Sequence, residues 1–122
     1  MRQWWSRASV HFQQSANALA AIQSAAKADD IARTAAACQQ LHDADAAGLQ
    51  ADMPTPDPDL TIAVQDMIDD VHTAAHICMS LGPTSSTDEI NQLRSYFAQA
   101  GAHLQTANEI MKRDGLPGAP TA

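Results

Sequence analysis

The sequence predicts an all-α protein, an antiparallel up-down-up-down four-helix bundle held by one disulfide. Apolar residues recur at a three-four spacing along four long segments, which is typical of amphipathic helices. Most of the six prolines and five glycines fall between those segments or after the last one, in residues 53–59, 82–83 and 115–120. Aromatic residues make up only 4% of the chain, and many apolar positions are alanine. Alanine favours helix and lets helices approach closely, but it buries little area, so we expect a thin core.

The first half of the chain predicts two helices, over residues 3–26 and 30–51. We expect Asp29 to cap the second of these. The apolar face of the first helix reads Trp5, Ala8, Phe12, Ser15, Leu19, Ile22 and Ala26. The face of the second reads Ile31, Ala35, Cys38, His42, Asp45 and Leu49. Two polar residues interrupt this second face, so we expect it to pack less tightly than the others.

The third helix is predicted over residues 58–81. Asp57 is its expected N-cap, and Pro58 suits the first helical position because the N–H that proline lacks has no partner there. Gly82 and Pro83 end the helix. Its apolar face is the most regular of the four and consists of Leu60, Val64, Met67, Val71, Ala74, Cys78 and Leu81.

The fourth helix is predicted over residues 87–113, with Ser86 and Glu89 forming a capping box. Its apolar face consists of Ile90, Leu93, Phe97, Ala100, Leu104, Ala107 and Met111. The four helices form one domain over residues 1–114, and residues 115–122 are predicted to be a flexible tail.

The charge of the chain excludes one class of partner. The net charge is −7, and the seven basic residues are dispersed, whereas a nucleic-acid site needs clustered Lys and Arg. No run reaches the roughly 18 apolar residues of a membrane-spanning helix. The first residues carry basic side chains but no apolar region or cleavage site, so they do not form a signal peptide.

Cys38 and Cys78 are the only cysteines, and both lie on apolar faces of neighbouring predicted helices. We predict a disulfide between them, with two inert buried thiols as the alternative. The bridge closes a loop of about 40 residues and contributes about 3–4 kcal/mol. A tight hairpin would place Cys38 level with Val71, so the bridge requires the proline-rich connection to run on past the end of the second helix. Neither cysteine has a CxxC partner, which argues against redox catalysis.

The histidines offer two candidate sites. His72 and His76 have the i, i+4 spacing that can hold zinc, copper or haem between helices. They lie off the apolar face of their helix, so we expect exposed histidines, with no metal and no cofactor. His42 lies on the core face beside Cys38 and Asp45. We expect a buried His42–Asp45 hydrogen bond with a structural role, and a catalytic pair is the alternative.

The carboxylates and nucleophiles form no catalytic pattern. Asp66 and Asp70 are an i, i+4 pair on an outer helix face, where a solvated surface is the usual arrangement. The sequence contains no glycine-rich phosphate loop and no nucleophile–base motif. We therefore expect no catalytic residue and no enzymatic activity.

Trp4 and Trp5 are adjacent, so on a helix their side chains point about 100° apart. Trp5 fits the apolar face and is predicted to be in the core. Trp4 completes the core edge or lies outside, where it would be a candidate interaction residue at a partner or a membrane interface.

Several short motifs carry a resemblance to known proteins. They are a WW pair (Trp4, Trp5), a Cys-x-x-Leu/Met-His segment (Cys38, Leu41, His42), a PTPDPDL turn (residues 54–60) and a His-x-Ala-Ala-His-x-Cys-like spacing (residues 72–78). With these motifs the chain resembles small actinobacterial, chiefly mycobacterial, proteins of unassigned function. The resemblance implies a helical extracytoplasmic domain that follows an N-terminal membrane anchor or export signal. No anchor precedes Trp4, so we expect a trimmed domain or a soluble relative of that group.

These observations favour a non-enzymatic bundle of the cell envelope that binds a protein partner or forms a homo-oligomer. The disulfide supports that location because disulfides persist in oxidising compartments, and a cytoplasmic location is the alternative. A bundle that binds a small ligand, a metal or haem, in its interior or at His72 and His76, is the second hypothesis. A hydrolytic or transfer enzyme that uses His42 and Asp45 is the third.

Overall fold

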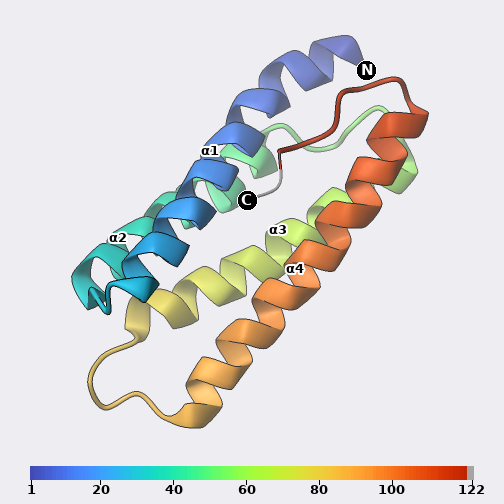
Figure 1. Ribbon diagram of the computed structural model, residues 1–122. Helices are drawn as coiled ribbons and strands as arrows, with labels where there is room; N and C mark the ends of the chain where they lie inside the picture. Colours follow the sequence, from blue (N-terminus) through green and yellow to red (C-terminus); the bar gives the residue numbers. More distant parts are fainter. Residues whose placement is uncertain (121–122) are drawn as a thin grey trace.

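The computed structural model describes residues 1–120, which form four helical segments (Figure 1). The second segment, called the second helical arm, consists of an α-helix that continues into a π-helix. The elements are α1 (Arg2–Lys27), α2 (Ile31–His42), the π-helix η1 (Asp43–Leu49), α3 (Pro58–Ser80) and α4 (Thr87–Arg113). Over the described part of the chain there is no β-strand. The predicted all-α helical bundle is therefore confirmed. None of the described helices combines the length and the apolar character that a membrane span needs.

Side chains cap three of the helices, and two of the predicted caps are confirmed. The Asp57 side chain accepts a hydrogen bond from the backbone N–H of Asp59, and Ser86 accepts one from Glu89. The cap predicted at Asp29 is wrong by one residue, because Asp30 is the cap of α2. Asp29 has a φ of 52° in the turn that follows α1, so it is not in the extended conformation of an N-cap.

The second helical arm differs from the continuous α-helix predicted over residues 30–51. Seven of its residues, Asp43–Leu49, form a π-helix, in which each turn holds more residues than an α-turn does. Relative to one another, the residues before and after this segment therefore do not face the directions that a period of 3.6 residues predicts.

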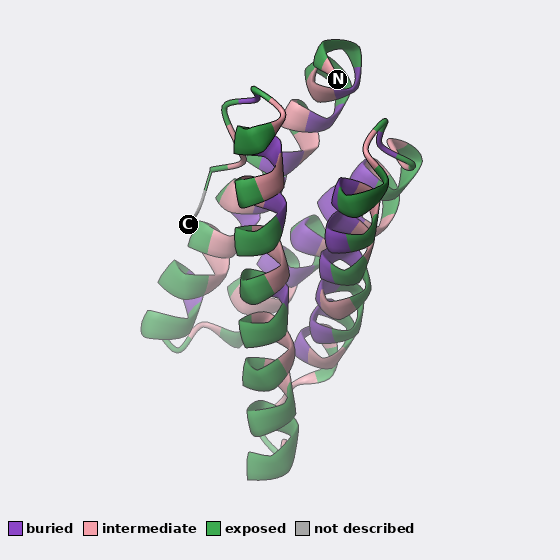
Figure 2. Cartoon of the chain, turned by 90° about the vertical axis from the view of Figure 1, so that its right-hand side faces the viewer, coloured by how far each residue is buried: buried purple, intermediate pink, exposed green. Residues whose placement is uncertain are grey.

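The helices pack in chain order and leave one side of the bundle open. α1 packs on α2 and η1, α2 on α3, and α3 on α4. Within residues 1–120, no α carbon of α1 comes within 8 Å of one in α4. Figure 2 shows the buried residues on the faces that the helices turn toward one another, with exposed residues outside. The largest fully buried side chains include Trp4, Leu41, Leu49, Leu60, Ile68 and Met111.

The predicted disulfide is present between Cys38 of α2 and Cys78 of α3, whose α carbons lie 6.2 Å apart. Both cysteines are buried. The connection after η1 runs on past the end of that segment to reach the start of α3, as the predicted register of the bridge requires (Figure 1). Thr55 fastens this connection, because its buried hydroxyl hydrogen-bonds to the Thr61 hydroxyl and to the Asp57 carbonyl.

The end of the chain differs from the flexible tail predicted over residues 115–122. Leu116 is 7% exposed and belongs to the core, and its backbone N–H donates to the Met111 carbonyl at the end of α4. The Ala119 N–H donates to the Asn108 side chain at 2.8 Å. An apolar side chain and two hydrogen bonds thus hold this segment against the bundle, whereas residues 121–122 lie outside the described part.

Candidate metal-binding site

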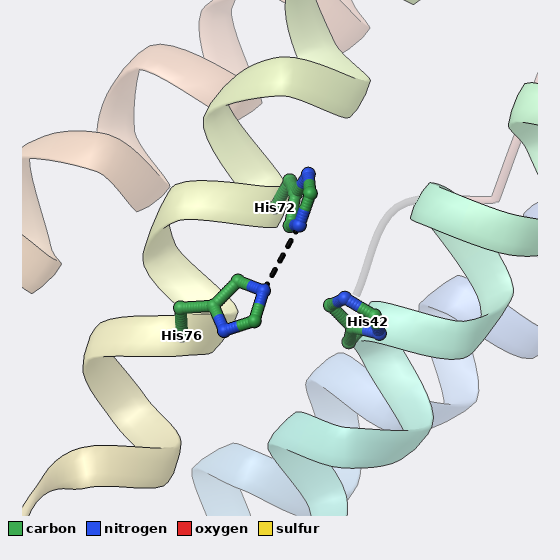
Figure 3. Close-up of side chains that lie close together, drawn as sticks. All are labelled: His42, His72 and His76. Atoms are coloured by element: carbon green, nitrogen blue, oxygen red, sulfur yellow. Dashed lines mark hydrogen bonds between the residues drawn. The ribbon is translucent and has the colours of Figure 1, made fainter.

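Three histidines from two helices gather on one side of the bundle. His42 ends α2, and His72 and His76 lie one turn apart on α3 (Figure 3). Each ring offers one nitrogen, and these three nitrogens all lie within 4.8 Å of one another. His72 and His76 are exposed and His42 is half-buried, so the group is open to solvent. We call these three residues the histidine cluster.

The helix register explains why these side chains meet. Residues four apart on an α-helix lie on one face, which brings His72 and His76 together. The disulfide fixes α2 against α3 at Cys38 and Cys78, and the two helices run in opposite directions. On α2, His42 lies one turn after Cys38. On α3, the position one turn before Cys78 lies between His72 and His76. The bridge thus sets the register that brings the third histidine to the other two.

The spacing of the cluster suits one ion after a small adjustment. The Nε2 atoms of His72 and His76 are 2.9 Å apart and share a hydrogen bond. The ring centroids of the three histidines are 4.7 to 5.0 Å apart. Imidazole nitrogens bind zinc at 2.0–2.1 Å, so two of them on a tetrahedral ion lie about 3.3 Å apart. Small rotations of three partly exposed rings reach that distance.

A carboxylate already orients one ring of the cluster. The Nδ1 atom of His42 and an Asp43 oxygen hydrogen-bond at 3.2 Å, and the Gln39 amide donates to the same oxygen at 2.9 Å. These two hydrogen bonds, with His42 first, hold the pKa of Asp43 below its ordinary value. Metal-ligating histidines commonly bond a carboxylate through the ring nitrogen that does not bind the metal. In that arrangement Nε2 would be the His42 ligand atom.

The predicted hydrogen bond between His42 and Asp45 is wrong. His42 bonds to Asp43 and turns toward α3, whereas Asp45 is fully buried and neither of its carboxyl oxygens has a hydrogen-bond partner. His42 is the last residue of α2, whereas Asp45 lies inside the π-helix that begins at Asp43, so the 3.6-residue period that placed both residues on one face does not extend to Asp45. The catalytic pair considered for these two residues therefore does not form.

Asp45 has an unusual environment for a carboxyl group. Burial raises its pKa to about 7, and the neighbouring Ser15 hydroxyl and His11 oppose that rise. An ionised carboxylate is costly in such a place, because a buried charge without a partner loses its hydration. Near neutral pH this group therefore exists in both protonation states.

The other two histidines bind carboxylates outside the cluster. His11 of α1 lies 2.7 Å from Asp52, and His103 of α4 lies 2.8 Å from Asp70. Of the predicted outer carboxylate pair, Asp66 is exposed and Asp70 is half-buried against His103. The two residues thus have different surroundings.

Of the two places considered for Trp4, the structure has the core and not the exterior, and Trp5 is less buried than predicted. Trp4 is 2% exposed, and its indole N–H donates to the Asp52 carbonyl at 2.9 Å. Trp5 is only partly buried and lies with its ring centroid 5.8 Å from that of Phe12. Trp4 is therefore a core residue, and its predicted role as an interaction residue is wrong.

Comparisons of the chain with protein-family models, with curated proteins and with solved structures found no match. The structure of the site itself therefore carries the functional argument.

Proposed function

We propose that this protein binds one divalent transition-metal ion through His42, His72 and His76. The observation that carries the proposal is the convergence of three imidazole nitrogens within 4.8 Å, from two helices that a disulfide joins beside them. Imidazole is a good ligand for copper, zinc and nickel and a poor one for magnesium and calcium. Three imidazoles leave a coordination position for water, because the cluster faces solvent.

The proposal extends the second sequence hypothesis, which had only His72 and His76 as ligands. The partner-binding role stays a prediction, and the apolar faces that suggested it are only in part used for packing inside the bundle. We place the protein in an oxidising extracytoplasmic compartment such as the cell envelope. The disulfide supports this location, since thiols are kept reduced in the cytosol.

The test is a calorimetric titration of untagged, oxidised protein with Cu²⁺, Zn²⁺, Ni²⁺ and Mg²⁺. We expect one site per chain, an affinity for Cu²⁺ above those for Zn²⁺ and Ni²⁺, and no Mg²⁺ binding. At a free ion concentration of one hundred times Kd, binding stabilises the fold by about 2.7 kcal/mol. For 122 residues this raises Tm by about 10 °C.

Substitutions assign the ligands. Replacing an orienting partner of a metal ligand costs about 10- to 100-fold in affinity, so His72→Ala or His42→Ala should cost at least that much. His103→Ala is the matched control, because it removes a histidine from the neighbouring helix and outside the cluster. Equal binding by the His72→Ala and His103→Ala proteins would overturn the proposal, as would wild-type protein without affinity for any of the three transition metals.

A further inference from the structure

The open side of the bundle holds a cleft between α1 and α4. Its volume is about 600 Å³, within the range of cavities that hold small ligands. Leu19 and Ile22 of α1 form one wall, and Phe97 and Leu104 of α4 form the other. All four side chains are only partly buried, so each keeps apolar surface that no other helix covers. The cleft shares no residue with the histidine cluster.

Asp45 and Ser15 lie at the base of this cleft. Among the described residues that line it, Asp45 is the one ionisable group. Both of its carboxyl oxygens are buried, and neither makes a hydrogen bond of good geometry, although the neighbouring Ser15 hydroxyl lowers its pKa. His11, the nearby histidine, bonds to Asp52 instead. An unsatisfied buried carboxyl is costly, and a donor supplied by a ligand would remove that cost.

We propose that the cleft binds a small, mainly apolar molecule that carries one protonated amine, with the amine paired to Asp45. The apolar walls fit the body of such a molecule, and a protonated amine can donate to both carboxyl oxygens. The net charge of −7 favours the approach of a cation over that of an anion. Burial raises the pKa of Asp45, and pairing with a cation would lower it again, because a cation stabilises the ionised form that burial disfavours.

Gly101 provides a way to close the cleft without disturbing the core. It lies in the wall formed by α4, and a Cβ atom added there meets nothing within 4 Å. A large side chain at this position therefore has room to enter the cleft. Alanine at the same position adds the Cβ alone and serves as the matched control for phenylalanine.

The experiment is a calorimetric titration of metal-free protein with decylamine, decanol and decanoate, each below its aggregation concentration. We expect decylamine to bind most tightly and decanoate most weakly. Asp45→Asn should lower decylamine affinity at least about tenfold, the value of a charge-assisted hydrogen bond, and leave decanol affinity unchanged. Gly101→Phe should abolish binding of decylamine, and Gly101→Ala should bind it as the wild type does.

Three results would overturn the proposal: no decylamine binding by the wild type, equal decylamine affinity of the wild-type and Asp45→Asn proteins, or tighter binding of decanol or decanoate than of decylamine. Circular dichroism and Tm show whether each variant folds. If Gly101→Phe does not fold, Gly101→Leu takes its place. Because the titration uses metal-free protein and other residues, its outcome does not depend on that of the metal experiment.

Discussion

The buried carboxyl of Asp45 predicts an unusual dependence of stability on pH. Burial raises the pKa of Asp45 from its ordinary value of 3.8 to about 7 in the folded protein. Between these values the folded protein keeps the proton and the unfolded chain has lost it, so stability falls as the pH rises. The Asp45 contribution is complete below pH 3.8 and is lost as the pH passes 7. The difference between the two pKa values corresponds to about 4 kcal/mol.

Asp45→Asn removes the titrating group and keeps its size. Between pH 5 and pH 8, Asp45 lowers the free energy of unfolding of the wild type by about 2.5 kcal/mol, and asparagine does not have this effect. Urea unfolding of both proteins at the two pH values measures this change in the free energy of unfolding. Subtracting the change of the variant from that of the wild type cancels the contributions of the groups that the two proteins share. We expect the variant to gain about 2.5 kcal/mol relative to the wild type on going from pH 5 to pH 8.

The exposed carboxyl of Asp66 supplies the control. Asp66→Asn makes the same change of charge on the outer face of α3, away from the buried site, and so controls for the loss of one negative charge. Parallel profiles for Asp45→Asn and the wild type would refute the reasoning, because they would show that Asp45 ionises as readily in the folded protein as in the unfolded chain.

Three further predictions concern the disulfide and two glycines. Replacing Cys38 and Cys78 by serine should lower the free energy of unfolding by about 3–4 kcal/mol and weaken metal binding, because the bridge orders the two helices that carry the histidines. Urea unfolding and zinc titration measure the two effects. Unchanged zinc affinity would show that the disulfide does not order the histidine cluster. Gly101→Ala should stabilise the protein by about 1 kcal/mol, since its Cβ meets open space within a helix. Gly48→Ala should destabilise it, because a Cβ there lies 2.6 Å from the His11 ring; thermal unfolding of both alanine variants checks the opposite signs, and equal signs would contradict the packing seen at Gly48.

The architecture could be predicted because its signals are local. The three-four spacing of apolar residues and the prolines and glycines between helices identify four helices, and their ends agree with the structure to within about two residues. The disulfide could be predicted because both cysteines lie on apolar faces of neighbouring helices. Which of the two tryptophans is more buried could not be predicted in this way, since the position of Trp4 depends on the Asp52 carbonyl, which is distant in the sequence.

The π-helix is the main reason why the site differs from its prediction. A pattern read at 3.6 residues per turn assumes an unbroken α-helix, and it placed His42 and Asp45 on one core face. His42 still belongs to α2 and keeps the α-helical register of Cys38, so it faces α3. Asp45 lies inside the π-helix of Asp43–Leu49 and is at the base of the cleft instead. No single residue in that segment identifies a π-helix, because such segments depend on packing as well as on local preference.

The histidine cluster could have been predicted from the sequence, but only by comparing positions on two helices and not from the spacing along one. Once Cys38 and Cys78 are aligned on antiparallel helices, His42 falls level with His72 and His76. The prediction treated the two α3 histidines by themselves, and so it missed the third histidine of the cluster. A disulfide that is inferred from sequence therefore also gives the cross-helix register of the residues around it.

The most direct measurement of the metal site is a ¹H–¹⁵N spectrum of the five imidazole rings during a Zn²⁺ titration. Coordination changes the nitrogen shifts of the rings that bind the ion. We predict that His42, His72 and His76 respond together and saturate at one equivalent of zinc, and that His11 and His103 do not respond. Equal responses from all five rings, or none from His42, would contradict a three-histidine site.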